Sequence, residues 1–212
     1  MRMLNLRRLF PWCLALGRGL LGPVLVLCQA SGWSGPALAS MVVVGLVSDI
    51  FDGALARRWK TDTDALRLTD SMTDIIFYLG AGYAFALECP DLWDIYRPVV
   101  GAMIALEALR FIADLARFRR PSSYHAFLSK LAGLLISLGV VAALTADEGP
   151  DILLAVAGAL LTVGLGVGIL SQLEGLLMTF ILPRWRRDVR SLAAALRLRR
   201  ELLTDGEIIP TP

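Results

Sequence analysis

Four aspartates lie in or beside apolar stretches of the sequence, at spacings that group them in pairs. Asp49 and Asp52 are three residues apart, and Asp70 and Asp74 are four apart. Residues at these spacings share one face of an α-helix. A carboxylate in an apolar, membrane-type helix is costly unless it faces a partner or a watery cavity. Two helices that each present a pair of acids therefore predict an oxygen-ligand cage for a hard divalent cation, Mg²⁺ or Mn²⁺.

A purely structural alternative is that these acids form ion pairs with basic residues in a solvated loop. That alternative suits Asp62 and Asp64, which lie between the two apolar stretches. It does not suit Asp49 and Asp52, because they follow the apolar run 41–47. Since ionisable residues inside membrane helices are functional by default, we favour a metal or substrate site.

The stretch from Asp49 to Asp74 resembles the signature of the CDP-alcohol phosphatidyltransferases, D-x2-D-G-x2-A-R-x8-G-x3-D-x3-D. All fixed positions but one are in register, and Leu66 stands where the signature has glycine. The resemblance implies transfer of a phosphatidyl group from a CDP-linked lipid, such as CDP-diacylglycerol, to the hydroxyl of a small polar alcohol. CMP is the product released.

The resemblance also implies roles for individual residues. Two Mg²⁺ or Mn²⁺ ions would be held by four carboxylates: Asp49, Asp52, Asp70 and Asp74. Asp74 is also the expected catalytic base. Three further signature residues would line the CDP moiety: Gly53, Ala56 and Arg57. Arg18 resembles an arginine in the family's first helix, where pairing with an acid of the second or third helix and contact with substrate are equal alternatives.

Later basic residues are candidates for binding a phosphate group on the acceptor: Arg110, Arg117 and Lys130. Such a set favours a phosphorylated polyol such as glycerol 3-phosphate, because arginine and lysine both bind phosphate oxygens. Cations at helix ends also serve as anchors that reach the membrane surface, which is the alternative for these residues.

Composition places the chain among membrane proteins. It has 212 residues, 56% of them hydrophobic, and a mean hydropathy of +0.64. That is too apolar for an ordinary soluble domain and predicts an all-α polytopic membrane protein, with a single domain over residues 1–204. The net charge is only +2, and no nucleic-acid partner is expected. The three cysteines have neither metal-ligand nor redox spacing.

Spanning helices need about 20 mostly apolar residues. Six segments qualify: 12–30, 37–56, 68–87, 99–115, 124–146 and 152–182. Residues 1–10 place leucines among arginines, which predicts a short basic helix lying in the membrane interface. Residues 183–203 carry arginines and periodic leucines and are expected at the surface or in the cytosol. Residues 205–212 carry no fold signal and are expected to be a disordered tail.

The basic residues predict an orientation. Most of the 21 lysines and arginines fall on the side that holds both termini, which identifies that side as the cytosol. On this frame nearly all charges within the helices lie in the cytosolic half, so we expect a hydrophilic cavity there. The predicted location is the cell (inner) membrane, with the active site facing the cytoplasm. Because members of this family commonly pair, a homodimer is left open.

Other classes of protein also use acidic motifs in membranes. An intramembrane prenyltransferase would need more helices and lacks the element formed by Gly53, Ala56 and Arg57. An ion-coupled transporter places its charges near the midplane on broken helices, whereas the charges here are one-sided. A non-catalytic relative is the third alternative, because Leu66 would narrow the nucleotide pocket unless the helix begins after it and points it away.

Overall fold

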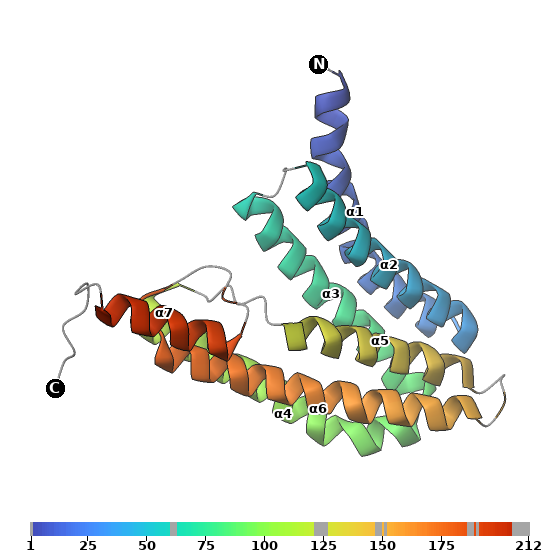
Figure 1. Ribbon diagram of the computed structural model, residues 1–212. Helices are drawn as coiled ribbons and strands as arrows, with labels where there is room; N and C mark the ends of the chain where they lie inside the picture. Colours follow the sequence, from blue (N-terminus) through green and yellow to red (C-terminus); the bar gives the residue numbers. More distant parts are fainter. Residues whose placement is uncertain are drawn as a thin grey trace. The chain divides into compact units, whose positions relative to one another are not determined.

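The protein is described here from a computed structural model that covers residues 2–59, 63–120, 127–146, 150, 152–185, 189 and 191–204. Within these residues all regular structure is helical and there is no strand, which confirms the predicted all-α class (Figure 1). The helices, in chain order, are α1 (Arg2–Ala30), α2 (Gly35–Trp59), α3 (Asp64–Glu88), α4 (Pro90–Phe118), α5 (Phe127–Ala146), α6 (Ile152–Ile181) and α7 (Leu192–Thr204).

Each of the predicted spans falls within one of these helices wherever the structure describes it, except that α6 ends at Ile181, one residue before the predicted end at residue 182. Among the described residues, three stretches are long and apolar enough to cross a membrane: Leu9–Ala30, Leu128–Ala146 and Ile152–Ile181. Helix α2 contains a shorter apolar stretch, Gly35–Phe51. The helices α2, α3 and α4 carry most of the chain's acidic residues, which lower the hydropathy of these helices. Their membrane insertion stays a prediction, and so does the orientation of the termini.

The start of the chain differs from expectation. Residues 2–10 do not form a helix of their own, because α1 runs without interruption from Arg2 to Ala30. The physical reason is that no glycine precedes Gly17 and the early leucines and arginines are strong helix formers. Pro11 lies inside this helix and does not end it. That residues 2–10 lie in the membrane interface remains a prediction.

Contacts divide the chain into two compact units. The first unit comprises Met1–Asp94 and Ser137–Ala159, and the second comprises Ile95–Ile136 and Leu160–Pro212. Helices α4, α5 and α6 each contribute to both. The expectation of one domain over residues 1–204 stays a prediction, and the predicted tail lies outside the described residues.

In the first unit, α1 packs against α3 and α2, and the three helices lie side by side (Figure 1). The backbones of α1 and α3 are in close contact at Gly22 and Gly80. A Cβ added at Gly80 would overlap the carbonyl group and Cα of Gly22. The core of this unit includes Leu25, Leu38 and Phe77, each at most 1% exposed. This close contact fixes which residues of α1 lie beside which residues of α3.

In the second unit, α4 and α6 contact each other at a constant sequence offset. The Tyr96 hydroxyl lies 2.8 Å from that of Thr162, and the buried Thr179 donates a hydrogen bond to Asp114 at 2.6 Å. These pairs are 66 and 65 residues apart, so the two helices run parallel. Residues beyond α6 pack back against its end in an apolar cluster of Met178, Leu182, Val189 and Ala195.

Candidate functional site

Helices α2 and α3 are consecutive, and the short connection between them places their acids at similar depth. Asp49 lies ten residues before the end of α2, and Asp74 ten residues after the start of α3. At a rise of 1.5 Å per residue, both are about 15 Å from the connection. Thr63 caps the start of α3, where its Oγ1 accepts a hydrogen bond from the Leu66 amide at 3.2 Å. The cap satisfies a backbone donor that the first helical turn leaves unpaired.

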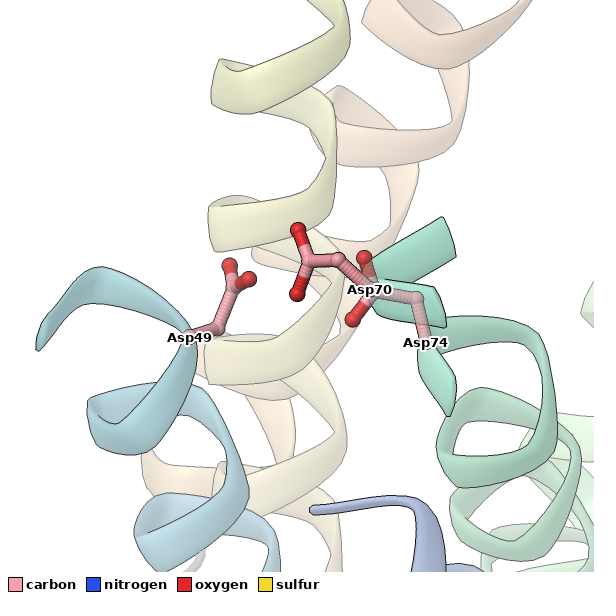
Figure 2. Close-up of side chains that lie close together, drawn as sticks. All are labelled: Asp49, Asp70 and Asp74. Atoms are coloured by element: carbon pink, nitrogen blue, oxygen red, sulfur yellow. The ribbon is translucent and has the colours of Figure 1, made fainter. Parts of the chain in front are cut away.

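Three of the predicted metal ligands lie together. The side chains of Asp49, Asp70 and Asp74 point toward one another from α2 and α3 (Figure 2). One carboxylate oxygen from each lies within 4.8 Å of the others, and the side chains are 38%, 36% and 31% exposed, respectively. Each acid is thus half-buried, tied to the protein on one side and accessible from the other.

Arg18 of α1 joins this cluster. Its Nη1 lies 2.5 Å from Asp49 Oδ1, while its Nη2 lies 2.7 Å from Asp74 Oδ1 and also donates to Asp70 Oδ1. The Arg18 side chain is only 1% exposed. The sequence left pairing and substrate contact as equal alternatives for Arg18, and the structure pairs it with acids of both α2 and α3.

For four signature residues the structure describes the backbone alone: Asp52, Gly53, Ala56 and Arg57. Their backbone is helical and continues α2 toward Trp59. Their roles as a fourth ligand and as the lining of the CDP site stay predictions.

Leu66 can be located more closely. Helix α3 begins at Asp64, before Leu66, and the Leu66 side chain is 6% exposed. The alternative in which the helix begins after Leu66 is therefore wrong, and the leucine is a buried residue of the first turn. The CMP-release assay proposed below tests whether the protein is active with leucine at this position.

The candidates for acceptor phosphate all lie in the second unit. Arg110 forms an ion pair with Glu107, with Nη2 to Oε1 at 2.5 Å, and Gln172 of α6 donates to the other oxygen of Glu107. Arg117 donates to the carbonyl oxygen of Leu182 at 3.2 Å. Lys130 is exposed on α5. Their role in acceptor binding stays a prediction.

Glu174 has no predicted role, but the structure shows one. Its Oε1 accepts a hydrogen bond from the Leu192 amide at 2.9 Å. Leu192 is the first residue of α7, so Glu174, which lies 18 residues earlier in α6, caps the N-terminus of that helix. A carboxylate at a helix N-terminus is also favourable to the helix dipole.

The acid cluster fits a divalent cation. Its donors are all carboxylate oxygens, the ligand type that Mg²⁺ and Mn²⁺ prefer. Two oxygens on opposite sides of one Mg²⁺, each bound at roughly 2.0–2.1 Å, are about 4 Å apart, so three oxygens within 4.8 Å of one another are close to the spread of ligands around one shared ion. The three carboxylates share the guanidinium of Arg18, and carboxylate oxygens are ligands that attract a hard divalent cation.

Taken together, helices of spanning length and a half-buried cluster of oxygen donors define an integral membrane protein with a candidate metal centre. The family model for CDP-alcohol phosphatidyltransferase matches residues 8–170, and the chain belongs to that family. Its members transfer a phosphatidyl group from a CDP-alcohol to an alcohol and use divalent metal ions. Comparisons with curated proteins and with solved structures gave no significant match.

Proposed function

We propose that the protein transfers the phosphatidyl group of CDP-diacylglycerol to a hydroxyl of a phosphorylated polyol such as glycerol 3-phosphate. The acceptor oxygen forms a new bond to the lipid-bearing phosphorus, the diphosphate bridge to that phosphorus breaks, and CMP leaves. The observation that carries the proposal is the convergence of Asp49, Asp70 and Asp74 in a member of this family.

The acids divide the work between binding and proton transfer. We assign two Mg²⁺ or Mn²⁺ ions to Asp49, Asp52, Asp70 and Asp74. When bound, such ions neutralise phosphate oxygens and stabilise the leaving group. Asp74 accepts the proton of the acceptor hydroxyl, a step for which a positioned base contributes about 10²–10⁴-fold. The remaining signature residues, Gly53, Ala56 and Arg57, are assigned to the CDP moiety.

The apolar surroundings of the acid cluster support a lipid substrate. A hollow between α1 and α3 is lined almost entirely by apolar atoms, from residues that include Gly22, Val26, Ile76 and Leu79. Its first lining residue on α1, Gly22, is one helical turn beyond Arg18, and its first on α3, Ile76, is two residues beyond Asp74. A diphosphate at the acids would thus have an apolar surface beside it for the lipid chain.

We assign the acceptor's phosphate to Arg110 and Lys130, with Arg117 as a further candidate, because charged donors of this kind bind phosphate strongly. The proposed setting is the inner membrane, with six spans, both termini in the cytosol and the acids opening to the cytoplasm. That side supplies the soluble acceptor and receives CMP.

The test is release of CMP from CDP-diacylglycerol by the purified protein with Mg²⁺ or Mn²⁺, across a panel of acceptors, with mass detection of the lipid product. We expect turnover with a phosphorylated polyol. Asp74→Asn should remove turnover while leaving binding of the CDP-lipid largely intact. Asp91→Asn, which changes an exposed acid at the start of α4, is the matched control and should behave as wild type.

One result would overturn the proposed reaction, and another would overturn only the assignment of its base. No CMP release with any acceptor would identify a non-catalytic relative and direct attention to Leu66. Turnover by Asp74→Asn at the wild-type rate would remove the assignment of the base but keep the reaction.

A further inference from the structure

Arg18 is a charged side chain in a helix that is otherwise long and apolar enough to cross a membrane. It is among the largest fully buried side chains of the described residues. A guanidinium in such a place is stable only if its charge is compensated, because its loss of hydration is costly. The compensation comes from Asp49, Asp70 and Asp74, which also form the candidate metal cluster.

The guanidinium and a divalent cation therefore use the same acids. Arg18 takes Oδ1 of each of the three carboxylates, two of them through Nη2 and one through Nη1. A cation that binds these oxygens must displace the arginine or share the carboxylates with it. Either course costs free energy, because two positive groups cannot hold the same oxygens at full strength.

The guanidinium also has a stabilising role before metal binds. Three carboxylates with oxygens within 4.8 Å of one another repel strongly unless a cation lies between them. Arg18 supplies that cation from α1, and it holds the acids of α2 and α3 close to the spacing of ligands around one shared ion.

We infer that Arg18 is a positioning residue that acts as a built-in counter-ion of the metal-free site. It holds the acids together in the absence of metal and, by competing for their oxygens, weakens the binding of divalent cations. Removing it should tighten metal binding and at the same time destabilise the metal-free protein. A residue needed only for packing would destabilise the fold without tightening metal binding.

The test compares the wild type, Arg18→Gln and Arg18→Lys in detergent, at fixed ionic strength, by Mn²⁺ titration and thermal unfolding. For Arg18→Gln we expect the Kd for Mn²⁺ to fall by about tenfold or more, since one positive charge next to a divalent ion is removed. Its unfolding temperature without metal should fall, and the rise on adding Mn²⁺ should exceed that of the wild type. Arg18→Lys, which keeps the charge, should lie between the two.

The matched control is Arg58→Gln, which removes a positive charge from an exposed position on α2 of the same unit. It should leave both the Mn²⁺ Kd and the metal-free unfolding temperature close to wild type. An equal tightening in this control would show that net charge, rather than the Arg18 contact, sets the affinity, and would overturn the inference.

This inference rests on the metal assignment in the proposed function, and the titration separates the two. If neither the wild type nor Arg18→Gln binds Mn²⁺, both fail. If the wild type binds and Arg18→Gln binds equally or more weakly, only the role of Arg18 fails. Should Arg18→Gln fold only with Mn²⁺ present, the counter-ion role is supported. Should it not fold at all, Arg18→Lys decides, and a Kd equal to wild type would overturn the inference.

Discussion

The close contact between α1 and α3 can be tested by adding a single methyl group. A Cβ at Gly80 would lie 2.7 Å from both the carbonyl carbon and Cα of Gly22, and closer still to its carbonyl oxygen. All of these are backbone atoms, so no side-chain rotation can relieve the overlap. Gly80→Ala must push α3 away from α1 over this stretch. Gly82, two residues further along α3, has no atom within 4 Å of its added Cβ.

The two substitutions differ in sign once helix propensity is included. Overpacking costs about 1–3 kcal/mol, and backbone contact points to the upper part of that range. Replacing glycine by alanine within a helix gains about 1 kcal/mol at either site. We therefore expect Gly80→Ala to lose about 1–2 kcal/mol, while Gly82→Ala is neutral or stabilised by up to about 1 kcal/mol. For a chain of this size, the loss at Gly80 corresponds to a fall in Tm of about 2–8 °C.

The assay is thermal unfolding of both variants in the same detergent, followed by CMP release. Because Gly22 and Arg18 lie one turn apart on α1, the displacement at Gly80 should also loosen the acid cluster and lower activity. Gly82→Ala should keep wild-type activity. Equal unfolding temperatures for the two variants would refute the backbone contact between α1 and α3.

Other contacts give further predictions. Phe77→Ala removes a ring that is 1% exposed, and should cost about 3–5 kcal/mol, seen as a large fall in Tm; a change below about 1 kcal/mol would show that the ring is not in the core. Thr179→Val removes the hydroxyl that donates to the buried Asp114 and should cost about 1–3 kcal/mol in thermal unfolding; an unchanged Tm would contradict this hydrogen bond. Lys130→Gln should raise KM for the phosphorylated acceptor by about tenfold, with KM for CDP-diacylglycerol unchanged. Equal effects on both substrates would argue against acceptor binding.

The sequence predicted the helices better than their ends. The span predicted over residues 37–56 lies in α2, which runs from Gly35 to Trp59. Hydropathy marks the part of a helix that prefers lipid, whereas the helical hydrogen bonds continue into the polar residues beyond it. In the same way α4 begins at Pro90, well before the predicted start at residue 99, because proline suits the first turn of a helix. The helix then continues through Pro98.

The site was readable from the sequence only in part. The spacing of Asp70 and Asp74 placed both on one face of a helix, and the structure brings them to Asp49. The sequence did not determine which groups Arg18 contacts, because those contacts depend on how α1 is aligned along α3. The contact of Gly22 with Gly80 sets that alignment, and two glycines in apolar helices carry no pairing information in the sequence.

Pairs between distant helices show the same limit. The spacing of Glu107 and Arg110 allows an ion pair within one helix, and the structure contains it. The added hydrogen bond from Gln172 to Glu107, and that from Thr179 to Asp114, join residues 65 positions apart. Such pairs follow from the parallel packing of α4 and α6, which no local pattern encodes.

The most direct test of the metal assignment is to locate Mn²⁺ by its anomalous scattering in crystals of the protein grown or soaked with that ion. A peak bonded to oxygens of Asp49, Asp70 and Asp74 is the expected result, with the Arg18 guanidinium withdrawn from at least one of those acids. Crystals saturated with Mn²⁺ that show no peak at these carboxylates, with Arg18 still bridging all three, would contradict the account.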